Sequence, residues 1–318
     1  MLNIPYRHIV VAGAGTMGAV LTRLLAQAGC AVTLWNHRQP SLDRAAARHR
    51  LDLEDLAARG RLAEAPEAVL ARISYSTDEA VFAPADFVVE SIMEDLDLKH
   101  AFFRRICALV SPETILTTNT SGLRVTDIAQ AVTEPGRFCG MHWWNPPDLI
   151  PLVEITRGEA TRQETAEAVR DLALALEKRP VIVQKDILGI IGNRLQYAVL
   201  REAMHILELG AAGPRDIDDA MKYGPGFRYS ILGPLETADL GGLNINHAVS
   251  HYLYPDLGDE LVSPPLERLA EEGRLGVKTG GGFYDYAPGE GDEKIRWRND
   301  LFEKQWDLLK DRPWKDRE

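Results

Sequence analysis

The 318-residue sequence has little cysteine, no excess of positive charge and no long apolar run. Its three cysteines, Cys30, Cys107 and Cys139, are scattered, which argues against a disulfide framework or a zinc site and predicts a reducing compartment. A formal net charge of −11 argues against a nucleic-acid partner, because phosphate binding needs a basic face. Without an apolar run of the length of a membrane span, we expect no membrane partner.

The composition that remains is typical of a globular protein, with 45% hydrophobic and 26% charged residues. The length allows two domains. The first predicted strand begins by Ile9, which leaves no room for a signal peptide before it. Together with the cysteine pattern, this predicts a cytoplasmic protein without a bound metal.

A glycine-rich turn follows that strand and precedes an apolar helix. Gly13 allows a tight turn, Gly15 lets the backbone approach a pyrophosphate, and Gly18 lets the helix pack closely on the sheet. The helix N-terminus, from Thr16 and Met17, would face the anion with its unpaired N–H groups. An ordinary tight turn between strand and helix is the alternative, but three glycines between two strands favour a dinucleotide site.

The second predicted strand ends at Asn36, where dinucleotide folds usually carry an acid that holds the ribose hydroxyls. Without that carboxylate a 2′-phosphate is not repelled, and Arg38 could bind it with its planar fork. The alternative is that Arg38 is a solvated loop residue and that Asn36 binds the ribose of NAD. The local chemistry thus leaves NAD and NADP open, with a slight preference for NADP.

Predicted strands and helices alternate over about 185 residues, and strand signals then stop. We therefore predict an α/β protein with a Rossmann-like doubly wound sheet, followed by a smaller all-α domain. The predicted boundaries are a dinucleotide-binding domain at 1–186, a helical substrate and dimerisation domain at 187–286, and a C-terminal helical extension at 287–318. Within them we expect one long helix over 187–209 and a strand-like tail over 283–286.

Polar residues concentrate in three segments of otherwise apolar character, which contain Ser121, His142 followed by Glu154, and Asn193. Alcohol oxidation needs a base, and a histidine backed by a carboxylate suits that task. Ser121 and Asn193 could donate hydrogen bonds to the reacting oxygen. Taken singly, each has a plainer explanation: a core histidine, a surface charge, a turn former and a helix cap.

The sequence resembles the L-3-hydroxyacyl-CoA dehydrogenase family over residues 5 to 286. The resemblance is carried by the glycine loop at 13–18, the segments at 88–90, 119–121, 142–146, 189–194, 233–234 and 278–284, and three single residues, Glu94, Lys99 and Glu154. It implies that His142 is the general base with Glu154 as its partner, and that Ser121 and Asn193 contact the reacting oxygen. It also implies that Glu94, Lys99 and Asn119 lie along the cofactor, and that the helical domain forms a homodimer.

Some features depart from that family pattern. The helical arm at 40–72 has no lysine, whereas acyl-CoA members generally hold CoA phosphates with a lysine-bearing arm. The segments around 142–154, 193–198 and 226–229 look more like relatives that oxidise free acids, among them L-gulonate 3-dehydrogenases and a pyridine-carboxylate dehydrogenase. Trp143 and Trp144 could narrow the channel for a pantetheine arm.

Two further residues are candidates for substrate binding, Asn145 next to the tryptophans and Arg228, which could grip a carboxylate bidentately. A surface arginine on a loop is an equally good interpretation of Arg228. We therefore predict an NAD(P)-dependent dehydrogenase that oxidises a secondary (3-)hydroxyl of a small carboxylated substrate by hydride transfer. The alternative is a 3-hydroxyacyl-CoA (3-hydroxybutyryl-CoA) dehydrogenase.

Overall fold

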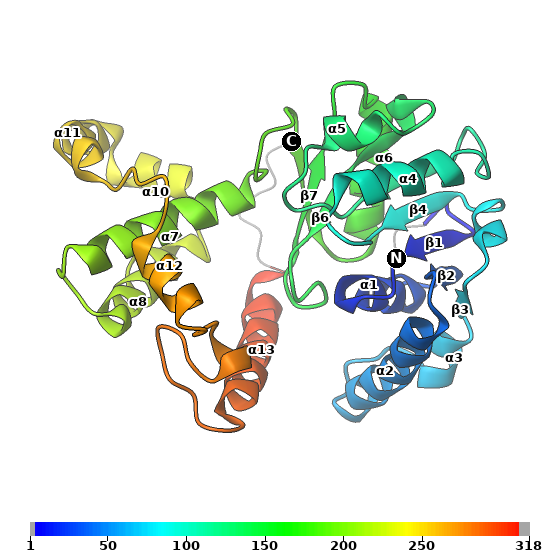
Figure 1. Ribbon diagram of the computed structural model, residues 1–318, viewed down its shortest axis with the longest axis horizontal. Coiled ribbons are helices and arrows are strands. Elements are labelled where there is room, and N and C mark those ends of the chain that lie inside the picture. Colours follow the sequence, from blue (N-terminus) through cyan, green and yellow to red (C-terminus); the bar gives the residue numbers. More distant parts are fainter. Residues whose placement is uncertain (1–3, 312–318) are drawn as a thin grey trace. The chain divides into compact units, whose positions relative to one another are not determined.

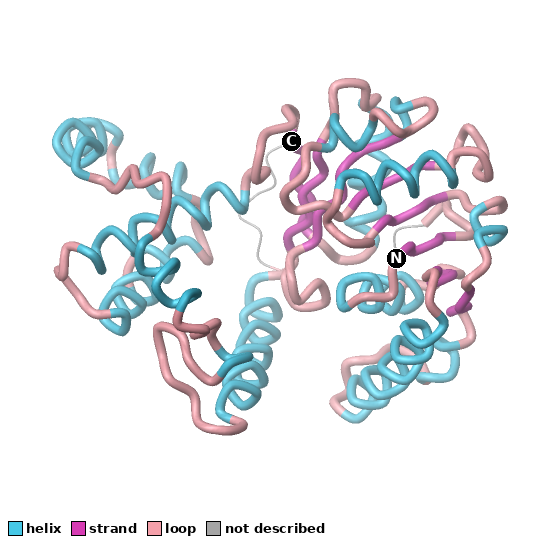
Figure 2. The backbone as a smooth tube through the Cα atoms, in the orientation of Figure 1, coloured by secondary structure: helices cyan, strands magenta, loops and turns pink. Residues whose placement is uncertain are grey.

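The computed structural model describes residues 4–311. It divides into two compact units, Met1–Asn193 and Arg194–Glu318. The sequence pattern predicted this boundary at residue 186. The first is built on a sheet and the second consists of helices and loops (Figure 2). The predicted fold class, a doubly wound α/β sheet followed by helices, is confirmed.

The sheet of the first unit has eight strands in the order β3-β2-β1-β4-β5-β6-β7-β8. All neighbouring strands pair in parallel except β6 and β7, which are antiparallel. The order reverses direction between β1 and β4, and the carboxyl ends at such a point form the usual ligand crevice of open α/β sheets. The strands are β1 (Ile9–Ala12), β2 (Val32–Trp35), β3 (Ile73–Ser76), β4 (Phe87–Glu90), β5 (Ile115–Thr118), β6 (Phe138–Trp143), β7 (Leu152–Thr156) and β8 (Arg179–Val183).

Helices cover both faces of this sheet (Figure 1). Ile9 and Val11 of β1 belong to a buried cluster with α1, α2, α3 and α6, while Val10 and Ala12 belong to a second cluster with α4 and α5. Because side chains alternate along a strand, a strand buried on both faces reads as a continuous apolar run. These helices are α1 (Thr16–Gln27), α2 (Gln39–Ala58), α3 (Pro66–Leu70), α4 (Leu96–Ile106), α5 (Val125–Ala129) and α6 (Gln163–Ala175).

The second unit is helical, and several of its helices begin with proline in the first turn, where the missing N–H has no intrahelical partner. No helix within residues 4–311 is long and apolar enough to cross a membrane. The helices are α7 (Gly192–Glu208), whose first two residues belong to the first unit, α8 (Pro214–Tyr223), α9 (Pro225–Tyr229), α10 (Pro234–Gly241), α11 (Leu243–Leu253), α12 (Pro264–Glu271) and α13 (Glu290–Leu309).

Two predicted elements differ in the structure. The long helix expected from residue 187 begins only at Gly192, because Gly189 and Ile190 have φ angles of 77° and 55°, in the left-handed region that interrupts a right-handed helix. The strand expected over 283–286 is absent from the described residues, where Gly281 forms isolated bridges with Gly276 and Asp285. Three successive glycines before it, from Gly280, lack the side chains that pack a strand edge.

Candidate active site

The glycine turn leaves room for a ligand at one position only. A Cβ on Gly13, whose φ is +113°, would lie 2.3 Å from the Ser91 carbonyl oxygen, and one on Gly18 would lie 1.8 Å from that of Gly13. A Cβ on Gly15 would meet no atom of residues 4–311 within 4 Å. Gly15 is also the N-cap of α1, and no side chain caps the helix there. Open space against uncapped helix N–H groups fits a pyrophosphate at Gly15, Thr16 and Met17.

Asn36 is tied to the backbone on both sides of it. Its Oδ1 accepts a hydrogen bond from the Ala14 N–H at 3.4 Å, and its Nδ2 donates one to the Arg38 carbonyl at 3.2 Å. The residue is 9% exposed, whereas Arg38 is an exposed residue that precedes α2. Asn36 therefore joins the glycine turn to the start of α2, beside the position of the cofactor ribose in such folds.

Lys99 is buried in the first unit, and its ammonium group forms ion pairs with two carboxylates. Its Nζ is 2.6 Å from Glu90 Oε1 and 3.4 Å from Glu94 Oε2, and the side chain is 1% exposed. The Thr118 hydroxyl donates to the other oxygen of Glu90 at 2.6 Å. Burial raises the pKa of Glu90, although Lys99 opposes that shift. Lys99 therefore balances the charge of Glu90 and Glu94 beside the crevice at the carboxyl ends of the strands.

Glu94 holds the turn that carries Ser121. Its Oε1 accepts hydrogen bonds from the Thr120 hydroxyl at 2.6 Å and from the N–H groups of Ser121 and Gly122, both at 2.9 Å. Burial raises the pKa of Glu94, but these hydrogen bonds outweigh burial and hold the pKa below its ordinary value. The ionised carboxylate fixes the backbone at Ser121, while the serine itself is exposed.

Asn119 connects the carboxyl ends of three neighbouring strands. It follows β5, accepts a hydrogen bond from the Trp143 N–H of β6 at 2.9 Å, and donates one to the Ser91 hydroxyl after β4 at 3.2 Å. These bonds engage both the oxygen and the nitrogen of the side-chain amide. The side chain therefore fixes the edge of the crevice at which the predicted site residues gather.

His142 and Glu154 lie directly opposite each other on the antiparallel pair β6 and β7. Opposite residues of such a pair point to the same face with Cβ atoms about 5 Å apart. His142 Nδ1 is 3.0 Å from Glu154 Oε2, and the two residues are 6% and 1% exposed. Because the carboxylate accepts from Nδ1–H, Nε2 of the neutral ring is left as a proton acceptor.

Glu154 is also held from the other side. Its Oε1 accepts hydrogen bonds from the N–H groups of Ile191 and Gly192, at 3.0 and 2.8 Å, just where α7 begins. Burial raises the pKa of Glu154, but the hydrogen bonds from His142, Gly192 and Trp144 outweigh burial and lower it. The carboxylate stays ionised behind the histidine, as a partner that stabilises an imidazolium must.

The four predicted catalytic residues all lie in the first unit, Met1–Asn193. Asn193 Nδ2 donates a hydrogen bond to the Ser121 carbonyl at 3.2 Å, and Asn193 follows the Gly192 N–H that binds Glu154. Contacts of the described residues therefore connect the three polar segments that spacing alone could not join. Asn145 is exposed directly after Trp144. Arg228 is exposed on α9 of the second unit.

Lys178 is a residue of the site that sequence reasoning missed. It is 5% exposed and donates to the carbonyls of Pro147 and Ile150 at 2.6 and 3.1 Å, with that of Asp148 at 3.5 Å. Burial lowers its pKa to about 8. Lys178 thereby holds the loop between β6 and β7. An isolated lysine after a helix gives no pattern that would have revealed this role.

The two tryptophans beside the histidine have different surroundings. Trp143 is 4% exposed and belongs to the apolar cluster on one face of the sheet, so it cannot narrow a substrate channel. Trp144 is half-buried, its ring centroid is 5.9 Å from that of His142, and its Nε1–H donates to Glu154 Oε2 at 3.0 Å. Of the two predicted to restrict access, only Trp144 is in a position to do so.

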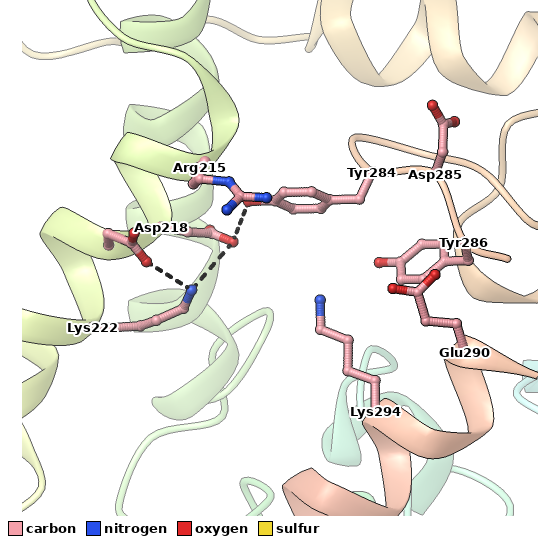
Figure 3. Close-up of a pocket in the computed structure, with 9 residues that line it drawn as sticks. Arg215, Asp218, Lys222, Tyr284, Asp285, Tyr286, Glu290 and Lys294 are labelled. Carbon is pink, nitrogen blue, oxygen red and sulfur yellow. Dashed lines mark hydrogen bonds and ion pairs between the residues drawn. The ribbon is translucent and has the colours of Figure 1, made fainter.

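The second unit contains a polar cavity of about 260 Å³ between α8, the 284–286 segment and α13 (Figure 3). Its charges largely satisfy one another. Lys222 lies 3.2 Å from Asp219, the Tyr284 hydroxyl donates to Asp218 at 2.8 Å, and the Lys294 ammonium lies over the Tyr284 ring. None of the predicted site residues lines it.

Comparison with known proteins extends over nearly the whole chain. Residues 8–187 match the model of the 3-hydroxyacyl-CoA dehydrogenase NAD binding domain, and residues 189–286 match that of the C-terminal domain of the same enzymes. The chain is 39% identical over 278 residues to a probable 3-hydroxybutyryl-CoA dehydrogenase of Deinococcus radiodurans, covering 87% of this chain and 99% of that protein.

A second relative acts on a pyridine carboxylate. The chain is 33% identical over 285 residues to a 5-formyl-3-hydroxy-2-methylpyridine 4-carboxylate 5-dehydrogenase of Mesorhizobium japonicum, covering 89% of this chain and 91% of that protein. A crystal structure of an enzyme of this kind, described as an NAD+-dependent dismutase, matches 96% of this chain and 99% of its own with a TM-score of 0.88 and 31% identity.

The (S)-3-hydroxybutyryl-CoA dehydrogenase of Ralstonia eutropha matches 89% of this chain and 99% of its own, with a TM-score of 0.75 and 33% identity. The two family models thus match both halves of the chain, the NAD binding domain first and the C-terminal domain second. The matches include the glycine turn and the segments that contain His142, Glu154 and Asn193. The chain belongs to the 3-hydroxyacyl-CoA dehydrogenase family, whose members are NAD-dependent oxidoreductases acting on CH–OH groups.

Proposed function

We propose that this protein oxidises the secondary (3-)hydroxyl of a small carboxylated substrate, with His142 as the general base. The observation that carries the proposal is the buried His142–Glu154 pair, with 3.0 Å between Nδ1 and Oε2. A histidine backed by an ionised carboxylate can take a hydroxyl proton and carry the resulting positive charge. Bound at the glycine turn, the nicotinamide cofactor supplies the acceptor for the hydride.

His142 and the residues around it have separate roles in proton transfer and in binding the substrate oxygen. His142 Nε2 takes the hydroxyl proton, and the ionised Glu154 stabilises the imidazolium that results. The Ser121 hydroxyl and the Asn193 amide donate hydrogen bonds to the substrate oxygen as its charge changes, and Glu94 keeps the Ser121 turn in place. The exposed amide of Asn145 is available to the rest of the substrate.

For the cofactor we propose NAD. NADP is the alternative, because the residue at the end of the second strand, Asn36, does not exclude a 2′-phosphate. The space over Gly15 fits a pyrophosphate, and the family model is that of an NAD binding domain. Asn119 and Glu94 lie at the strand ends along which the dinucleotide would extend, with Lys99 behind them. The slight preference for NADP rests on Asn36 and Arg38 alone.

A free acid is the substrate class we favour over a CoA thioester. The pyridine-carboxylate dehydrogenase structure matches this chain with a TM-score of 0.88, against 0.75 for the hydroxybutyryl-CoA enzyme. The arm at 40–72 contains no lysine, and the indole of Trp144 lies beside the base.

A 3-hydroxyacyl-CoA substrate is the second candidate, favoured by the 39% identity to the probable 3-hydroxybutyryl-CoA dehydrogenase. The two are separated by assaying nicotinamide absorbance with a panel of free hydroxy acids and the matching CoA thioesters, each with NAD and with NADP. We expect turnover of free acids. Activity confined to thioesters would refute the substrate class and leave the base assignment intact.

We propose Arg228 as the residue that binds the substrate carboxylate, because its guanidinium can form two parallel hydrogen bonds with it. Arg228→Ala should then raise the KM of carboxylated substrates about tenfold while a neutral alcohol of the same skeleton is unaffected. Arg296→Ala, an exposed arginine on α13, serves as the control. Equal effects on both substrates would remove Arg228 from the site.

We further propose that two copies associate through the helical unit, in line with the predicted division into a nucleotide-binding and a dimerisation domain. None of the helices α7 to α11 contains a buried residue. Leu235 and Leu240 of α10 are 81% and 75% exposed, and Phe227 and Ile231 nearby are 68% and 69% exposed. Apolar area of this extent is typical of a subunit interface.

The buried free thiols Cys30 and Cys139 suit a reducing cytoplasm.

A further inference from the structure

The Glu154 carboxylate receives four hydrogen bonds, two on each oxygen. Oε1 accepts from the N–H groups of Ile191 and Gly192, while Oε2 accepts from His142 Nδ1 and from the indole Nε1–H of Trp144, both at 3.0 Å. The base and the indole therefore share one acceptor atom, Glu154 Oε2. The residue is 1% exposed, so water does not supply alternatives to these partners.

We propose that Trp144 is a positioning residue of the His142–Glu154 pair, which sets the basicity of the pair through the indole N–H and its orientation through the indole ring. This inference rests on the proposed role of His142 as general base. Trp144 acts on His142 through Glu154, and no direct bond between their polar atoms is involved.

The indole is held in the orientation that this role needs. A Cβ on Gly192 would lie 2.5 Å from Cζ2 of Trp144 and 3.3 Å from Glu154 Oε2, so the absence of a side chain at Gly192 makes room for the ring against the carboxylate. The rings of Trp144 and His142 are tilted by 54° at a centroid distance of 5.9 Å. The ring, the carboxylate and the start of α7 thus form one packed unit around the base.

The N–H of Trp144 has a definite electrostatic effect. A donor on Oε2 withdraws charge from the oxygen that stabilises the imidazolium, and hydrogen bonds to an ionised acceptor are among the strong ones. Glu154 is the ionisable side chain hydrogen-bonded to His142 within residues 4–311, and the start of α7 contributes two backbone N–H groups to the same carboxylate. Without the indole N–H, Glu154 would favour the protonated histidine more strongly.

The neighbouring tryptophan provides a matched control. Trp143 is the last residue of β6 and Trp144 follows it, but the side chain of Trp143 belongs to the apolar cluster, and its buried Nε1 has no hydrogen-bond partner among residues 4–311. Phenylalanine at either position removes an N–H and some ring area. Only at position 144 does this change remove a bond to the pair.

The first experiment is the pH profile of kcat/KM for wild type, W144F and W143F, with thermal unfolding to confirm that each variant is folded. For W144F we expect the midpoint of the acid limb to move upward by about 0.5–1 pH unit, since one pH unit corresponds to about 1.4 kcal/mol. W143F should keep the wild-type midpoint. An unchanged midpoint in W144F, or equal shifts in both variants, would overturn the proposal.

A second experiment needs no turnover and separates this proposal from the proposed function. In protein labelled with 15N at the tryptophan indoles, the signals missing from W144F and W143F assign the two N–H groups. The Trp144 signal should shift with pH in wild type and lose that titration in His142→Gln, while the Trp143 signal stays constant. A Trp144 signal that ignores pH would refute the coupling, whether or not any tested substrate is oxidised.

Discussion

The two units of this chain hold their side chains in different ways. In the sheet unit, two apolar clusters fix the strands, and all four predicted catalytic residues are joined by contacts within that unit. In the helical unit, helices α7 to α11 contain no buried residue and expose large apolar side chains. We infer that the first unit positions the four catalytic residues by its own contacts. The second unit needs another protein surface to bury its exposed apolar side chains.

The largest expected effect is on assembly. Leu240→Asp places a charge on an apolar surface that we propose is covered by a second copy, and burying an unpaired charge is costly. We expect the mass in solution to fall from two copies to one, measured by light scattering after size exclusion. Leu51→Asp on α2 is the matched control, since Leu51 is 62% exposed in the sheet unit. If Leu240→Asp keeps the mass of wild type, α10 lies outside any interface.

A smaller effect is expected on the stability of the sheet unit. Lys178→Met leaves the carbonyls of Pro147 and Ile150 without their donor, and we expect a loss of about 2 kcal/mol in the free energy of unfolding. Urea unfolding of both proteins measures it. Lys185→Met, a lysine of the same segment that is exposed, should cost less than about 0.5 kcal/mol.

The pH dependence of that loss is a second test of the Lys178 environment. Burial lowers the pKa of Lys178 to about 8, against about 10.4 in an unfolded chain. Between these values the unfolded state binds more protons, so this group adds stability as the pH rises from 8 to 10. The stability advantage of wild type over Lys178→Met should therefore widen over that window. A constant or narrowing difference would show that the amine is not desolvated.

The smallest expected effect concerns cofactor choice. Asn36→Asp places a carboxylate beside the ribose, which repels a 2′-phosphate and accepts hydrogen bonds from a 2′-hydroxyl. We expect the ratio of kcat/KM with NAD to that with NADP to rise about tenfold, or 1.4 kcal/mol. His37→Asp, one position further on and exposed, controls for the added charge. An unchanged ratio would mean that other residues decide between the cofactors.

Sequence reasoning went furthest where one local pattern carries the structure. The glycine turn with its flanking strands, and the apolar runs of a sheet buried on both faces, follow from side-chain size and alternation. The break before α7 was missed because left-handed conformation at Ile190 has no signal in an otherwise helical pattern. The fold class was thus predictable, whereas the start of that helix was not.

The site depended on information that lies outside any local pattern. The separation of twelve residues between His142 and Glu154 says nothing about contact until β6 and β7 pair in antiparallel register. The roles of Trp144 and Lys178 come from atoms that the loop between those strands brings together. Resemblance to a family named the base and its partner, but the sharing of one carboxylate oxygen was visible only in three dimensions.

The central claim is that His142 moves a proton and does not hold the cofactor. Its most direct test compares turnover and cofactor affinity in His142→Gln, which keeps a polar side chain but removes the base. We predict that kcat falls by about 100- to 10,000-fold, while the Kd of the dinucleotide measured by calorimetry changes less than about twofold. A variant that turns over near the wild-type rate, or one that loses the cofactor along with activity, would contradict the account.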